Sequence, residues 1–339
     1  MKALKYAGVT LLLTLLLNFV FSLSPTLYEW LYFRTVFQYI RFVYDHSIAF
    51  LPFPMIYISL LLVVVAVFYL YKRRKMAFWH SLLVCIIWII NLFYILWAFN
   101  YNQLNLRSRL GLESGTVDST YITKEFHKQT AIITELLDTM SVKKSPIQLE
   151  TILREEQEKI LSSWSWPVLG RVRVRSLPPG ALLHFRTSGI YIPHAFEGHL
   201  DAGLHPIQHP FTMAHEMAHG YGITDESECN FIAYLTCIQS DQLFIRYSAE
   251  LAYWRYLASY YRRLHSDSWA AEYAKLDPRL LNDLSEIREQ VNRFKDWMPK
   301  YRDLIYDSYL KTHGVKAGIR SYDLMIVLIK AYRENKENI

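Results

Sequence analysis

A short motif near the middle of the chain carries the residue types of a zinc enzyme. Residues 215–219 read His-Glu-Met-Ala-His, and in a helix this spacing places both imidazoles on one face. His215 and His219 could therefore hold one Zn²⁺ ion, with Glu216 as a general base acting on water. No charged residue occupies the two spacer positions of the motif or the positions directly beside it, as in a helix buried beneath an active site. We predict that this helix begins at Pro210 and ends near Gly220.

A catalytic zinc ion takes three protein ligands, and the segment after the motif offers the third. Glu226 shares a predicted helix face with residues small enough to allow close approach to the first helix: Cys229, Asn230, Ala233 and Cys237. Glu228 lies on an apolar face, three residues after Asp225, where the acid of a capping box belongs. We favour Glu226 as the third ligand and Glu228 as a cap or a support for the ligands, with Glu228 as the alternative ligand. Cys229 is a rival, although a buried structural thiol is the commoner role.

These residues resemble the zinc site of a known group of enzymes. Glu226-Ser227-Glu228-Cys229-Asn230 is similar to the ExxA(D/N) element of gluzincin-like metallopeptidases, with cysteine in place of alanine. In that group the glutamate of the element completes the zinc site. Nearly the whole chain resembles an uncharacterised family of bacterial membrane proteins that carries a domain of unknown function, through its three apolar stretches and the runs 188–193, 215–220 and 228–235. The resemblance implies an exported zincin-type domain on a bacterial inner-membrane protein, and it implies no substrate.

The resemblance to zincin-type peptidases also implies where a substrate binds. In these enzymes the strand before the active-site helix forms the upper rim of the site and pairs with an extended substrate. Gly189, Ile190 and Tyr191 occupy that place here, and an ordinary internal strand is the alternative reading. A residue from later in the chain is expected to stabilise the oxyanion, and Tyr322 is the candidate beside a purely structural role.

Further histidines before the motif do not predict a second metal site. Their spacing fits no pattern of metal ligands, so we interpret them as loop residues near the active site: His184, His194, His199, His205 and His209. Glu197 is interpreted in the same way, as a single acid in a loop.

The elements that must position these residues begin with a strongly apolar N-terminal region. Three stretches are long and apolar enough to cross a bilayer, namely residues 6–23, 54–71 and 78–99. Lysines precede the first stretch and the run Lys-Arg-Arg-Lys at 72–75 follows the second. The positive-inside rule therefore predicts a cytoplasmic N-terminus and an exported C-terminal part, which is periplasmic in a bacterium of the implied kind. The first stretch could instead be a cleaved signal peptide, and the C-terminal part is exported in either case.

Between the first two stretches, residues 29–45 form an aromatic segment with one polar stripe at helical spacing. Such a helix is typical of the membrane interface, and a short helix packed on the spans is the alternative. Asn18 and Asn91 lie within predicted spans, where we expect them to form hydrogen bonds between helices. No acidic or basic residue lies within a span, which disfavours an ion-coupled transporter.

The remaining residues predict a mostly helical α+β domain. We assign residues 1–103 to the membrane region and 104–339 to the exported domain. Amphipathic helices are predicted over residues 120–137 and 145–161, with another beginning at Asp277-Pro278. Strands are predicted over residues 171–175, 181–185 and 188–192, with a turn at Pro178-Pro179-Gly180.

Together these features predict a membrane-anchored zinc metallopeptidase that acts on a peptide or protein. The alternative is an exported sensor or scaffold that keeps the zincin fold and binds zinc or peptide without catalysis. The net charge of +6 owes much to the cations that flank the spans, so it does not indicate a nucleic-acid partner. The expected partners are the substrate and the lipid bilayer, and the sequence identifies no protein partner.

Overall fold

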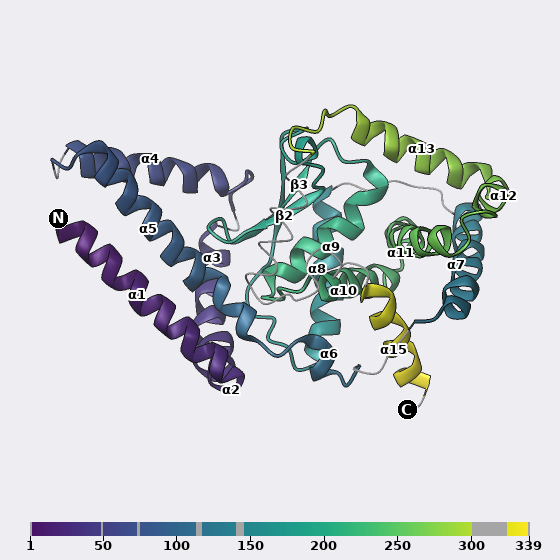
Figure 1. The fold of residues 1–339 in the computed structure, drawn as a ribbon, viewed down its shortest axis with the longest axis horizontal. Coiled ribbons are helices and arrows are strands. Elements are labelled where there is room, and N and C mark those ends of the chain that lie inside the picture. Colours follow the sequence, from purple (N-terminus) through teal and green to yellow (C-terminus); the bar gives the residue numbers. More distant parts are fainter. Residues whose placement is uncertain are drawn as a thin grey trace.

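The computed structural model describes residues 2–48, 50–72, 75–112, 117–139, 146–299 and 324–337. The described chain is mostly helical with one three-stranded sheet, which confirms the predicted α+β class (Figure 1). Long N-terminal helices extend to one side of the molecule, and the sheet and the later helices form the other side. Tyr322, Arg73 and Arg74 lie outside the described residues.

The N-terminal region is entirely helical where it is regular. Its elements are α1 (Lys2–Leu23), α2 (Pro25–Tyr28), the π-helix η1 (Glu29–Phe37), α3 (Gln38–Ile48), α4 (Ile56–Lys72), α5 (Phe78–Leu96) and the 3₁₀ helix η2 (Ala98–Asn102). Helix α5 packs against both α1 and α4. The Thr14 hydroxyl donates to Asn91 Oδ1 over 2.8 Å, and Asn102 Nδ2 donates to Asn18 Oδ1 over 2.9 Å. Both predicted interhelical asparagines are confirmed.

Two described helices, α1 and α5, are long and apolar enough to cross a membrane, whereas α4 has only 17 residues. Length and composition alone are weak evidence, because core helices and signal sequences pass the same test. Only 17% of the most apolar window of α1 and 22% of that of α5 are buried. A core helix of a soluble protein would be largely covered, so these helices need another apolar surface around them.

The polar stripe of the segment 29–45 faces protein. Gln38, Arg41 and Asp45 are buried on α3, whereas the large side chains of the opposite face are exposed: Trp30, Leu31, Val36, Tyr39, Phe42 and Val43. At these three positions the polar stripe therefore packs on protein, and the predicted location at a membrane interface stays a prediction. Arg41 and Asp45 bond to each other and to groups of Phe196, Gly220 and Arg171, and the apolar side of the segment is left exposed.

The C-terminal region adds the helices that surround the sheet. They are α6 (Leu106–Arg109), α7 (Ser119–Thr139), α8 (Pro146–Ser163), α9 (His209–Gly220), α10 (Glu226–Ile238), α11 (Leu243–Leu264), α12 (Trp269–Ala274), α13 (Pro278–Asn292) and α15 (Met325–Glu337). The helices predicted at 120–137, 145–161 and from Pro278 are confirmed. Asp277 caps the last of these by accepting a hydrogen bond from the backbone N–H of Arg279.

The sheet has the strand order β1-β3-β2, with β1 at Val174–Leu177, β2 at Gly189–Ile192 and β3 at Glu197–Asp201. Strand β1 runs parallel to β3, and β2 runs antiparallel to it at the edge. The strand predicted at 181–185 is wrong, because residues 183–185 form a 3₁₀ turn whose backbone N–H groups bond to Asp201. Glu197 was predicted in a loop, but it begins β3 and is fully buried.

One hydrophobic core joins the two regions predicted as separate domains. Phe33 and Phe37 of the N-terminal region belong to the same buried cluster as Trp166 and Phe196. The rings of Phe33 and Trp166 lie 5.1 Å apart, and those of Phe37 and Phe196 lie 5.7 Å apart. The N-terminal helices are thus packed directly onto the part of the chain that contains the motif.

Candidate metal centre

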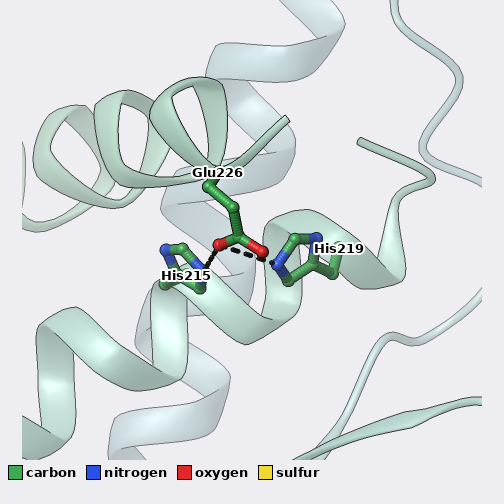
Figure 2. A group of neighbouring side chains, drawn as sticks. All are labelled: His215, His219 and Glu226. Atoms are coloured by element: carbon green, nitrogen blue, oxygen red, sulfur yellow. Dashed lines mark ion pairs between the residues drawn. The ribbon is translucent and has the colours of Figure 1, made fainter. Parts of the chain in front are cut away.

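Three predicted ligands come together between α9 and α10 (Figure 2). His215 Nε2 lies 3.1 Å and His219 Nε2 lies 3.6 Å from the same oxygen of Glu226. The donor atoms of the three side chains all lie within 4.8 Å of one another. All three residues are buried. Two imidazole nitrogens and one carboxylate oxygen are a donor set that catalytic zinc sites use, so these residues fit a zinc ion.

The turn between the two helices sets the geometry of the group. Helix α9 ends at Gly220, and α10 begins at Glu226, one residue after its cap. The Asp225 side chain accepts hydrogen bonds from the backbone N–H groups of Ser227 and Glu228, which fixes the first turn of α10. Glu226 is therefore the first helical residue and points back toward the histidines, as Figure 2 shows.

Both histidines are oriented through their Nδ1 atoms. His215 Nδ1 lies 2.9 Å from Asn230 Oδ1, and His219 Nδ1 lies 2.8 Å from the carbonyl oxygen of Ile223. Because both of these oxygens can accept the Nδ1 proton, each ring is held with its Nε2 atom facing Glu226. Nε2 is therefore the nitrogen that would bind a metal.

Neither rival ligand points into the group. Cys229 Sγ lies 3.3 Å from His219 Nδ1, which is the nitrogen on the far side of that ring from Glu226. Glu228 accepts a hydrogen bond from the backbone N–H of Arg107, at the start of α6. Glu228 therefore caps a different helix from the one expected, and burial raises its pKa to about 8. Glu226 is the acid that the fold places with the histidines.

Glu216 lies against the sheet on the same helix. A Cβ atom at Gly189 would come within 2.6 Å of Glu216 Oε1, and one at Gly198 would come within 2.7 Å of Glu216 Cβ. Glycine at both positions thus lets β2 and β3 approach the glutamate closely. Glu216 Oε2 is buried without a hydrogen-bond partner among the described residues. Burial raises the pKa of Glu216 to about 7, partly offset by His215 and His219.

Glu226 has the opposite electrostatic balance. Burial raises its pKa, but the nearby His219 and His215 lower it by more, so that the net pKa lies well below the usual value. Glu226 is therefore ionised at neutral pH, whereas the pKa of Glu216 itself lies at about 7. Such a difference between neighbouring acids is the arrangement that lets one hold a cation while the other exchanges a proton.

The predicted rim residues lie in the edge strand β2. Gly189 is beside Glu216, Ile190 is exposed, and Tyr191 packs near His219 with a distance of 6.4 Å between the ring centres. Strand β2 pairs with β3 only, so among the described residues its other edge has no strand partner. This edge position among the described strands agrees with the predicted rim.

Two residues of the N-terminal region also lie close to the centre, and no sequence motif indicates them. The Trp97 ring lies 5.7 Å from the His219 ring and 4.9 Å from the Tyr191 ring. Arg41 donates to the Tyr191 hydroxyl over 3.1 Å and to the Gly220 carbonyl oxygen over 2.8 Å. These contacts join residues that lie far apart in the sequence, which no local pattern could reveal.

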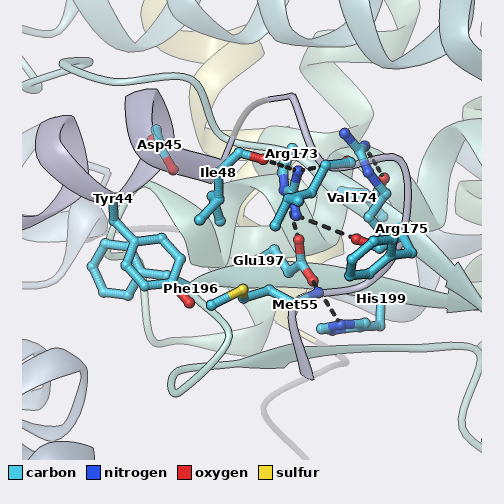
Figure 3. Close-up of polar contacts among 12 residues, drawn as sticks. Tyr44, Asp45, Ile48, Met55, Arg173, Val174, Arg175, Phe196, Glu197 and His199 are labelled. Carbon is cyan, nitrogen blue, oxygen red and sulfur yellow. Dashed lines mark hydrogen bonds and ion pairs between the residues drawn. The ribbon is translucent and has the colours of Figure 1, made fainter. Parts of the chain in front are cut away.

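The far face of the sheet is held by a second set of buried charges. Figure 3 shows Arg173 and Glu197 between the N-terminal segment and β3. Arg173 Nε donates to Glu197 over 2.6 Å, and Nη1 donates to the carbonyl oxygens of Ile48 and Leu51. Glu197 also accepts from the backbone N–H of Met55. The chain between α3 and α4 is thereby fastened to the sheet.

The other histidines do not form a second metal group among the described residues. Three of them bond to backbone carbonyl oxygens, namely His184 to Lys295, His194 to Ile89 and His209 to Leu204. His199 was predicted in a loop, but it lies in β3, fully buried, with Nε2 3.2 Å from Glu197.

Comparison with known proteins identifies a family without a described activity. No curated protein and no solved structure matches the chain. Residues 32–330 match the family described as a protein of unknown function (DUF3810). The matched range includes Arg41, Trp97, the sheet and both helices of the metal centre. The chain belongs to this uncharacterised DUF3810 family, as its predicted resemblance to a family of unknown function implied.

Proposed function

We propose that the protein is a membrane-anchored zinc metallopeptidase. The observation that carries the proposal is the buried group of His215, His219 and Glu226, with donor atoms within 4.8 Å of one another and Glu216 on the same helix. The Nδ1 contacts that orient both rings support metal binding through Nε2. The partnerless Glu216 oxygen supports a role in proton transfer, because a buried acid without a partner is costly unless it has a task.

In the proposed reaction, three residues would hold the metal and a fourth would transfer the proton. His215, His219 and Glu226 would hold zinc, which when bound supplies a Lewis acid that polarises a carbonyl group and acidifies water. Glu216 takes the proton of the attacking water, whose oxygen bonds to the carbonyl carbon of the peptide. As the C–N bond breaks, Glu216 delivers that proton to the leaving nitrogen. The products are a carboxylate and an amine.

An extended peptide is the substrate class that the sheet supports. The free edge of β2 offers backbone N–H and C=O groups for strand pairing, and Gly189 places this edge beside Glu216. Pairing through main-chain atoms gives affinity with little dependence on side chains. Peptides and unfolded or flexible segments of proteins would therefore bind.

The exposed apolar helices support a membrane location with three spans. Helix α4 has no buried residue, α1 exposes most of its large apolar side chains, and α5 exposes several of its own. The start of α1 and the connection between α4 and α5 lie at the same end of the molecule (Figure 1). Both carry the lysines and arginines of the predicted cytoplasmic side. The proposed location is a bacterial inner membrane, with the metal centre on the periplasmic side.

The experiment that tests the activity uses the full chain, because Arg41 and Trp97 contact the centre. Purified protein in lipid nanodiscs is loaded with zinc and offered a peptide library. We expect cleavage that a chelator abolishes, and Glu216→Gln should lower kcat by about 10³-fold while zinc stays bound. His219→Ala should lose both zinc and cleavage, whereas Cys229→Ala should keep zinc because its thiol lies behind His219.

The outcomes separate the proposal from its alternative. Zinc binding without cleavage of any library member would favour the non-catalytic sensor or scaffold. Cleavage that persists in Glu216→Gln would exclude the proposed mechanism.

A further inference from the structure

The metal centre lies beside the end of a candidate membrane span. Helix α5 ends at Leu96, and the next residue, Trp97, is buried with its ring 5.7 Å from that of the proposed ligand His219. The proposed ligand His219 is therefore in ring contact with the first residue after α5. Zinc-dependent hydrolysis at this centre would occur next to the bilayer surface.

The turn after the rim strand lies even closer to the spans. It joins β2 to β3, and its His194 Nε2 lies 2.9 Å from the carbonyl oxygen of Ile89 within α5. The carbonyl oxygen of His194 accepts from Ser59 Oγ of α4 over 3.0 Å. Ile89 precedes the end of α5 by seven residues, which is about 10 Å along the helix. The turn thus contacts both α4 and α5, and it meets α5 within the helix rather than beyond its end.

Strand β2 leads from this turn to the catalytic glutamate. Gly189 at one end lies beside Glu216, and Ile192 at the other end enters the turn at His194. The four residues of β2 cover roughly 10–13 Å at the rise of a strand. A peptide paired along the free edge of β2 would therefore have its cleaved bond near Gly189 and its distal end at the spans.

From this geometry we propose that the substrates are membrane-anchored polypeptides, cut a few residues from their anchor. The proposal rests on the proposed peptidase function and membrane location, and it names the substrate class of that site. An anchored chain that enters along β2 needs about four to six extended residues to reach from the bilayer to Glu216. A bond next to the anchor could not reach the centre, and a distant bond would arrive there less often because the effective concentration of a tethered site falls with tether length.

The test uses one peptide that contains the same cleavable sequence three times. The sequence is one found by the peptide library, and the copies are placed about 5, 15 and 25 residues from an N-terminal palmitoyl group. The full-length enzyme and the peptide share vesicles of phosphatidylethanolamine and phosphatidylglycerol, and mass spectrometry reports which copy is cut. An otherwise identical peptide without the acyl chain is the matched substrate, and Glu216→Gln is the matched enzyme control.

We expect the copy nearest the anchor to be cut roughly tenfold faster than the farthest one, and the peptide without the acyl chain to be cut at all three copies at similar rates. Because the three copies are on one molecule, enrichment of the peptide on the vesicle cannot produce this preference. Equal cutting of the three copies in the acylated peptide would overturn the proposal. In that case Glu216-dependent cleavage of the peptide without the acyl chain would still support the peptidase function.

Discussion

Asn230 is the residue that decides how well His215 can serve as a ligand. Its Oδ1 accepts the Nδ1 proton of His215, and its Nδ2 donates to the Tyr256 hydroxyl over 3.2 Å. The amide is therefore held from both ends, and the imidazole cannot rotate or change tautomer freely. His219 is held by a backbone carbonyl, which a side-chain substitution cannot remove. A substitution of Asn230 therefore tests how far the orientation of His215 matters for metal binding.

We predict that Asn230→Ala lowers zinc affinity by about 10- to 100-fold, because the ring of His215 loses the acceptor that fixes its tautomer. Competition with a chromogenic chelator measures the affinity. Cys237→Ala is the matched control, since Cys237 is buried on the same helix face two turns beyond Asn230, and it should leave the affinity unchanged. Equal affinities of the wild type and Asn230→Ala would contradict the assigned role.

The ligand set could be predicted from the sequence because it depends on helical spacing. His215 and His219 share a face through their separation of four, and Glu226 shares one with Asn230 for the same reason. The structure places Cys229 on that face too, but behind a histidine ring. Trp97 and Arg41 could not be predicted, because their contacts depend on how the N-terminal helices pack on the sheet.

At the scale of elements, buried polar side chains of α3 bind the sheet region to the N-terminal helices. Arg41 pairs with Asp45 over 2.7 Å and reaches the carbonyl oxygens of Phe196 and Gly220. Asp45 in turn accepts from the backbone N–H of Arg171. One ion pair therefore connects the end of α9, the turn after β2 and the chain before β1. These elements carry the proposed ligands and the rim.

Arg41→Ala should destabilise the protein by about 3–5 kcal/mol, because it leaves the Asp45 carboxylate buried without its partner. The midpoint of thermal unfolding in detergent reports the loss. Arg34→Ala is the matched control from the same polar stripe. Arg34 forms an exposed pair with Glu29, so its removal should cost at most about 1 kcal/mol. Similar losses of stability in the two variants would show that burial of the Arg41–Asp45 pair does not increase its contribution to stability.

The strands show where sequence patterns fail. Strand β3 reads Glu-Gly-His-Leu-Asp, which resembles a polar loop, yet all five residues are buried. Its acids are satisfied by distant groups, because Glu197 bonds to Arg173 and Asp201 accepts from the backbone of Gly180 and Leu182. The apolar run 181–185 forms a turn and not the predicted strand, because backbone N–H groups of this run bond to the distant Asp201. The helices were easier to predict because their apolar periodicity is local.

At the scale of the whole molecule, the N-terminal helices and the metal centre form one packed unit. Phe33 and Phe37 share a core with Trp166 and Phe196, and two buried arginines join the same regions. A fragment that begins at residue 104 would lack Trp97, Arg41 and the backbone partners of Arg173. We therefore predict that this fragment is poorly folded and inactive, as measured by circular dichroism and peptide cleavage beside the full chain. A folded, active fragment would show that the two regions are independent.

In the proposed membrane location, the number of spans decides on which side of the membrane the candidate metal centre lies. Helix α4 has 17 residues and a length of about 26 Å, somewhat less than a hydrocarbon core of roughly 30 Å. Its lack of buried residues nevertheless requires an apolar environment, and slight thinning of the bilayer accommodates such a mismatch at modest cost. With three spans and a cytoplasmic N-terminus, the chain is cytoplasmic at Lys75 and exported at Gln103. With only α1 and α5 as spans, both positions would be reversed.

A reporter enzyme that needs disulfide bonds distinguishes these arrangements, because cytosolic thiols stay reduced and the enzyme is active only when exported. We predict an inactive reporter when it is fused after Lys75 and an active one when it is fused after Gln103. Fusions to a variant in which Lys72, Lys75 and the two arginines between them become glutamine serve as the control, since removal of these cations should weaken the preference. Activity at Lys75 together with inactivity at Gln103 would leave α4 outside the bilayer and place the metal centre in the cytoplasm.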